Sequence, residues 1–68
     1  MYNFDTLFRD YLATCESYGS TGTLDEFITE CITLCQDEDD PVYFWVANYV
    51  SERNQSEPGW QETYSLPE

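Results

Sequence analysis

The sequence has no histidine and no lysine, and its only two cationic side chains are Arg9 and Arg53. Histidine is the commonest general acid–base group and lysine supplies the amine of Schiff-base chemistry, so these absences remove most routes to catalysis. Without histidine, and without a Cys-x-x-Cys pair, the chain also lacks the ligands of a zinc site. We therefore expect a protein that is not an enzyme and that uses no metal or cofactor.

Long hydrophobic runs are also missing. The longest apolar run, residues 42–47, has six residues, whereas a membrane-spanning helix needs about 20. The N-terminus has no basic segment ahead of an apolar one, so we expect no signal peptide. Three cysteines are an odd number, which argues against a complete disulfide framework. These features predict a cytoplasmic protein with Cys15, Cys31 and Cys35 as reduced members of its core.

Negative charge is what the chain has in excess. Fourteen acidic residues give a net charge of −12 over 68 residues. This charge repels nucleic acid and acidic membranes, so we expect neither as a direct partner. Yet 41% of the residues are hydrophobic and 18% are aromatic, whereas disordered acidic segments are poor in aromatics. The composition predicts a single folded acidic domain over residues 1–68 that binds a basic partner.

Apolar residues recur at helical spacing in three segments, which predicts an all-α fold, a small three-helix bundle. The helices are expected at about residues 3–18, 24–37 and 41–53. Residues 42–50 are also rich in β-branched and aromatic side chains, so a strand is the alternative there. A polar linker over residues 54–57 then leads into a C-terminal tail or a short fourth helix.

The predicted helix starts carry capping residues. Asn3 and Asp40 are suited to accept hydrogen bonds from the first turns of their helices, and Pro41 takes the first helical position. Thr23 and Glu26 have the spacing of a capping box. These signals support the helical interpretation of the third segment.

The acids are concentrated rather than evenly spread. Ten of the fourteen lie in the first 40 residues, where Arg9 is the only cation. Four adjacent carboxylates join the second and third predicted helices, and two arginines cannot pair them all. A solvated loop is one interpretation of this run, and an anionic contact surface is the other. A calcium loop is excluded because Val42 stands where such a loop requires glycine. The acidic candidates for partner binding are Asp37, Glu38, Asp39 and Asp40, then Asp25, Glu26, Glu30 and Asp10.

Aromatic residues form the second candidate set. Twelve phenylalanine, tyrosine and tryptophan residues are many for the core of a three-helix bundle. Tyr43, Phe44, Trp60 and Tyr64 are therefore either a second packing layer beneath the C-terminal tail or part of a contact surface, where such residues are enriched. We select the first three as candidate partner-binding residues, and a homodimer contact is one form that this surface could take.

Three segments of the sequence, taken together, resemble a known class of proteins rather than one particular family. They are the helix start Leu24–Ile28, the acid run and the opening of an aromatic helix at Asp40–Phe44. This arrangement, over about residues 4 to 50, resembles small acidic phage proteins that disarm bacterial defence: anti-CRISPR proteins and Ocr-type antirestriction DNA mimics.

The resemblance implies a phage or mobile-element inhibitor that acts in the cytoplasm of the host bacterium. Its partner would be a basic nucleic-acid-binding protein of the host defence system, either a CRISPR effector or a restriction enzyme. The carboxylates would occupy the nucleic-acid groove of that partner in place of phosphates. The alternative function is a protein–protein adaptor or antitoxin-like module that binds through exposed aromatic side chains.

Overall fold

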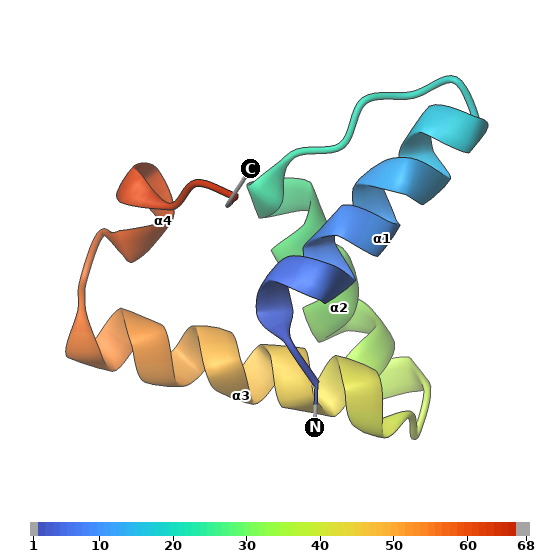
Figure 1. Cartoon of the computed structure of the whole chain (residues 1–68). Helices are drawn as coiled ribbons and strands as arrows, with labels where there is room; N and C mark the ends of the chain where they lie inside the picture. Colours follow the sequence, from blue (N-terminus) through green and yellow to red (C-terminus); the bar gives the residue numbers. More distant parts are fainter. Residues whose placement is uncertain (1, 67–68) are drawn as a thin grey trace.

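The computed structural model describes residues 2–66, and Figure 1 shows the helices that these residues form. In chain order the helices are α1 (Phe4–Ser17), α2 (Leu24–Asp37), α3 (Pro41–Ser56) and α4 (Trp60–Thr63). The described residues contain no strand. The all-α prediction is therefore confirmed, and the strand alternative for residues 42–50 is wrong.

The three long helices begin where their capping residues predict. The Asn3 side chain accepts a hydrogen bond from the Thr6 amide at 3.2 Å, and the Thr23 hydroxyl accepts one from the Glu26 amide at 3.2 Å. The Asp40 carboxylate accepts one from the Val42 amide at 2.9 Å. Each cap satisfies an amide that has no partner within its own helix, so the side chain fixes the start of the helix.

The third helix is longer than its predicted range. It continues to Ser56, so the prediction of a polar linker from residue 54 is wrong for its first three residues. Two contacts outside the apolar pattern support this last turn. Arg53 pairs with Glu57 at 3.5 Å, and Asn54 accepts a hydrogen bond from the Trp60 indole at 2.8 Å. The chain then turns at Gly59, whose φ of 86° suits glycine, into the single turn of α4.

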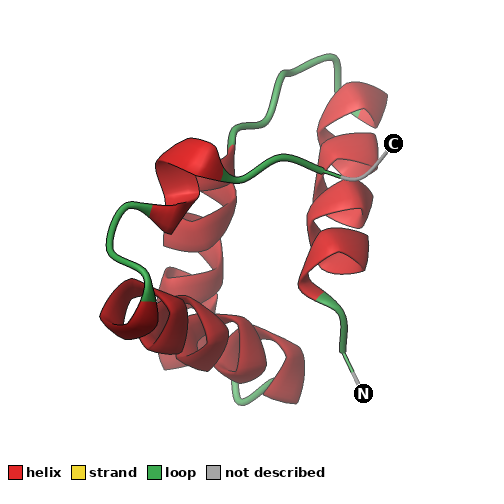
Figure 2. Cartoon of the chain, turned by 60° about the vertical axis from the view of Figure 1, so that its left-hand side comes forward, coloured by secondary structure: helices red, strands yellow, loops and turns green. Residues whose placement is uncertain are grey.

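Helices α2 and α3 form a closely packed pair, and α1 lies beside that pair (Figure 2). In Figure 1, α3 runs across the lower end of α2, and these two helices make the most extensive contact. Figure 2 shows α1 standing beside the α2–α3 pair as a separate layer, with α4 above the C-terminal end of α3. No helix of residues 2–66 is long and apolar enough to cross a membrane.

Aromatic rings fill the space between the layers. Phe4, only 4% exposed, stacks on Tyr49 with 4.7 Å between ring centroids and meets Phe27, Trp60 and Tyr64 edge to face. Such ring pairs stabilise a core beyond the apolar area that they bury. The aromatic surplus is thus largely absorbed by packing. The remaining fully buried core residues are Phe8, Phe27, Ile28, Cys31, Val46, Val50 and Trp60.

The three cysteines are free thiols, and only Cys31 is fully buried. Burial and the neighbouring Glu30 carboxylate raise the pKa of the Cys31 thiol to about 11. Cys15 and Cys35 are half-buried, so the prediction that all three belong to the core holds fully only for Cys31.

Candidate partner-binding surface

A groove of about 250 Å³ lies where α1, α2 and the first turn of α3 meet. We call it the α1–α2 groove. Eight of its ten lining residues are uncharged, and both charged ones are carboxylates. The lining residues are Leu7, Asp10, Tyr11 and Thr14 from α1, Phe27, Glu30, Cys31 and Leu34 from α2, and Val42 and Tyr43 from α3.

The groove follows from the width of the apolar face on each helix. On α2, Phe27 and Cys31 belong to the face that packs into the core, while Glu30 and Leu34 stand a turn apart at its edge. Leu34 follows Phe27 by seven residues and Cys31 by three, which places it at the edge of the same apolar face. It is half-buried and lines the groove.

Carboxylates lie close to the two tyrosines that line the groove. A side-chain hydrogen bond to Cys15, burial and the carboxylates of Glu30 and Glu26 raise the pKa of Tyr11 to about 12. Burial, followed by the carboxylates of Glu38 and Asp40, raises the pKa of Tyr43. Tyrosine is neutral at physiological pH even without such a shift, so the groove combines a largely uncharged lining with nearby negative charge.

The structure thus connects candidates from three parts of the sequence. Asp10, Glu30 and Tyr43 line the groove itself. Glu26 joins Glu30, Asp25 and Tyr11 in an adjoining depression on the outside of α1 and α2. The α1–α2 groove and this depression share Tyr11 and Glu30, so they form one continuous surface.

The acid run divides into two roles. Asp37, Glu38 and Asp39 are exposed, whereas Asp40 is half-buried because its carboxylate caps α3. Asp40 therefore has mainly a structural role, as the cap of α3. The exposed charge of the acid run comes from Asp37, Glu38 and Asp39. Among residues 2–66 the only ion pair joins Arg53 to Glu57, so the exposed acids of the run have no cationic partner there.

The arginines lie away from the groove. Arg53 places its guanidinium carbon 5.1 Å from the Trp60 ring centroid and 5.9 Å from that of Tyr49. Arg9 lies near enough to Tyr64 to favour its ionised form slightly. Both cations thus belong to the aromatic side of the molecule, and neither lines the groove.

Two aromatic candidates lie outside this surface. Trp60 is only 3% exposed, because its ring packs against Phe4 and its indole donates to Asn54. The expectation that Trp60 contacts a partner is therefore corrected: the residue is part of the core. Phe44 is 60% exposed, yet it is not among the residues that line the groove.

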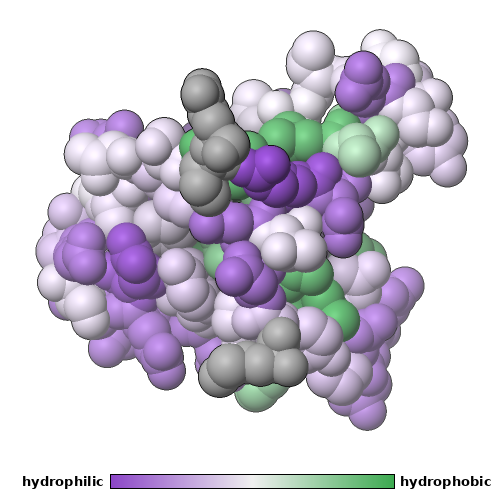
Figure 3. All heavy atoms as spheres, viewed as in Figure 1, coloured by the Kyte–Doolittle hydropathy of each residue, from purple (hydrophilic) through white to green (hydrophobic). Residues whose placement is uncertain are grey.

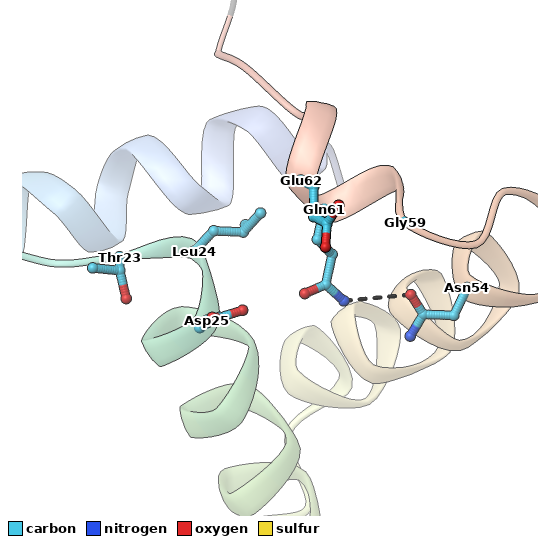
Figure 4. Close-up of a pocket in the computed structure, with 7 residues that line it drawn as sticks. All are labelled: Thr23, Leu24, Asp25, Asn54, Gly59, Gln61 and Glu62. Atoms are coloured by element: carbon cyan, nitrogen blue, oxygen red, sulfur yellow. Dashed lines mark hydrogen bonds between the residues drawn. The ribbon is translucent and has the colours of Figure 1, made fainter.

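Asp25 also borders a second, larger pocket of about 470 Å³ between the start of α2 and the α3–α4 connection (Figure 4). Its other lining residues are mostly polar, and Figure 4 shows Gln61 donating to Asn54 within it. Because Asn54 also accepts from the buried Trp60 indole, these polar groups hold α4 in place. We assign this pocket a structural role.

The space-filling view (Figure 3) shows a surface on which hydrophobic and hydrophilic residues are mixed. Figure 3 shows hydrophobic residues as separate patches between hydrophilic ones, and the outline is hollowed between the C-terminal end of α1 and the start of α3. The sequence predicted the charges of this surface individually. It did not predict Leu7, Tyr11 or Thr14 as lining residues, because helical spacing alone assigns the first two to the core.

Neither a family model nor a curated protein nor a solved structure matches this chain. The resemblance to anti-defence inhibitors therefore stays a prediction. We infer function from the charges and contacts of the chain itself.

Proposed function

We propose that this protein is a non-enzymatic inhibitor that occupies the basic nucleic-acid groove of a partner protein, with its carboxylates in place of phosphates. The narrower form of the proposal names a defence nuclease of a bacterial host as that partner, either a CRISPR effector or a restriction enzyme. The observation that carries the proposal is the set of exposed acids along α2 and its junction with α3, which has no cationic partner in the described part of the chain.

The size of the molecule limits the length of duplex DNA that it could imitate. Its longest dimension is 34 Å, and one turn of duplex DNA is roughly 34 Å long and carries about 20 phosphates. A net charge of −12 is closer to the ten or so phosphates of one strand over that length. The protein is therefore long enough for at most one duplex turn, and its total charge is too small to match the phosphates of both strands over that length.

The alternative, an adaptor that binds through exposed aromatic side chains, has less support. Trp60 is buried, and Phe44 is the only one of the three selected aromatics that is mostly exposed. Isolated exposed apolar residues are normal on soluble proteins. A partner held mainly by charge remains the better explanation of this surface.

The test is capture of binding proteins from a bacterial lysate on the immobilised chain, followed by elution with duplex DNA of about ten base pairs. We compare the wild type with the triple variant Asp37→Asn, Glu38→Gln, Asp39→Asn. The control variant Glu16→Gln, Glu52→Gln, Glu62→Gln removes the same amount of charge from other exposed positions.

We expect DNA to displace the captured protein and salt to weaken its binding steeply. The acid-run variant should capture much less, and the control variant nearly as much as the wild type. A partner that DNA does not displace, or equal loss in both variants, would contradict the proposal.

A further inference from the structure

The apolar part of the α1–α2 groove is left open by the fold. Leu34, Leu7 and Val42 come from three different helices and are only half-buried, although they adjoin the fully buried Phe27. At about 250 Å³, the groove is smaller than the roughly 300–1,000 Å³ of small-molecule pockets. It is therefore suited to one or two apolar side chains of a partner rather than to a cofactor.

The charges around the groove indicate the sign of the charge that such a partner should carry. Asp10 and Glu30 line it, and Glu26 and Glu38 lie close to its tyrosines, Tyr11 and Tyr43 respectively. No arginine lines it. A partner whose apolar side chain enters this surface is favoured if the residues beside that side chain are basic, because acidic neighbours would be repelled by the exposed carboxylates.

The form of the partner follows from the fold. The described residues contain no strand, so they offer no sheet edge to which an extended peptide could add. A groove between helices instead receives an amphipathic helix, which projects its apolar side chains into the groove at intervals of three and four residues.

We propose that the α1–α2 groove is the docking site for a basic amphipathic helix of the partner. An apolar residue of that helix enters between Tyr11 and Tyr43, and lysine or arginine residues one turn away pair with Asp10 and Glu30. This inference rests on the proposed function, because a basic helix is a common element by which proteins enter the major groove of DNA, and the acidic surface around the α1–α2 groove would take the place of that DNA. It adds that such a helix is recognised by its apolar side chains as well as by its charge.

The experiment uses two labelled probe peptides of about 14 residues, or ~21 Å of helix, to match the length of α2. Both carry the same lysines. One has leucine at positions i and i+4, and the other has glutamine at both. Binding to the full chain is measured by fluorescence anisotropy at low and at high salt.

We expect the leucine peptide to bind the wild type about tenfold more tightly, which corresponds to about 1.4 kcal/mol. The variant Leu34→Gln should lose this preference and keep the salt-dependent binding of both peptides. Ile32→Gln is the matched control, since Ile32 lies on the same helix, is 38% exposed and does not line the groove. Asp10→Asn with Glu30→Gln should weaken both peptides severalfold at low salt.

Other results would overturn the inference. Equal binding of the two peptides by the wild type, or a preference that survives in Leu34→Gln, would remove the groove as a docking site. The proposed function would then still stand on its own DNA-displacement test. A dimer that dissociates in Leu34→Gln, without any peptide preference, would show that a second copy of the chain covers the groove. Circular dichroism of each variant separates loss of binding from loss of fold.

Discussion

The two sides of this molecule differ in how completely their apolar side chains are buried. On the side where α1 meets α3 and α4, rings stack on rings, and the Arg53 guanidinium packs over two of them. On the side of the α1–α2 groove, apolar side chains are half-covered and the neighbouring carboxylates lack partners within residues 2–66. We infer that the first side provides most of the stability, and we expect the proposed partner to bind on the second.

This difference between the two sides matters because a domain of this size is only marginally stable. A folded chain of this size that leaves many like charges together gives up some stability to keep them. The aromatic side offsets that loss. Function is therefore expected on the groove side, and mutations should sort by which side they affect.

The largest expected effect is from Phe4→Ala, which breaks the aromatic side at its centre. Phe4 contacts four other rings, and truncation of a buried phenylalanine destabilises a protein by about 3–5 kcal/mol. We expect a largely unfolded chain. Phe44→Ala is the matched control, since this phenylalanine is 60% exposed and its loss should change stability by less than about 0.5 kcal/mol.

Urea denaturation followed by circular dichroism measures both variants. Similar midpoints for the two variants would mean that the rings around Phe4 do not carry the stability of the domain. The contrast between the two sides would then have no energetic basis.

A smaller effect is expected at the C-terminal closure of the aromatic side. The Tyr64 hydroxyl donates a hydrogen bond to the Asp5 carboxylate, and hydrogen bonds to charged groups contribute about 1.5–3 kcal/mol. Because Tyr64 and Asp5 are only half-buried, we expect Tyr64→Phe to destabilise the fold by about 1–2 kcal/mol. Tyr18→Phe, at a residue that is 83% exposed, should have no effect.

The same contact predicts a dependence on pH. Burial and the hydrogen bond to Asp5 raise the pKa of Tyr64 above its ordinary value of 10.0. The folded state therefore keeps this proton when the unfolded state loses it, so the stabilisation is complete below pH 10 and decreases as the pH rises above it. The free energy of unfolding should fall above pH 10, and less steeply in Tyr64→Phe. An equal slope in wild type and variant would contradict this assignment.

Sequence patterns predicted what depends on neighbours along the chain. The caps at Asn3, Thr23 and Asp40 are local, and all three form. The end of α3 was missed because Asn54 is held by the indole of Trp60, a contact that exists only once α4 folds back. Sequence patterns also left Trp60 open between a packing layer and a contact surface, because its burial depends on the position of a turn at Gly59 rather than on helical spacing.

The groove could be predicted only in part for the same reason. The carboxylates that lie near it are visible in the sequence, and the spacing of Leu34 from Phe27 places it at the edge of the apolar face of α2. Which residues of α1 meet Leu34 depends on how the two helices cross, and no periodicity within one helix contains that information. Tyr11 therefore has the spacing of a core residue and yet lines a surface groove.

The smallest expected effect compares two exposed acids at opposite ends of α2. Asp25 lies in the first turn of α2 and Asp37 is its last residue, so the helix dipole favours the first carboxylate and opposes the second. Asp25→Asn should destabilise the fold and Asp37→Asn should stabilise it, each by about 0.5 kcal/mol at low ionic strength. Thermal melting measures the difference, which should shrink at about 1 M salt because screening then acts over ~3 Å. If Asp37 is retained for binding, the stabilised variant should also be the weaker binder in the DNA-displacement test. A destabilised Asp37→Asn would mean that this carboxylate serves the fold, and the acid run would lose its place in the proposed interface.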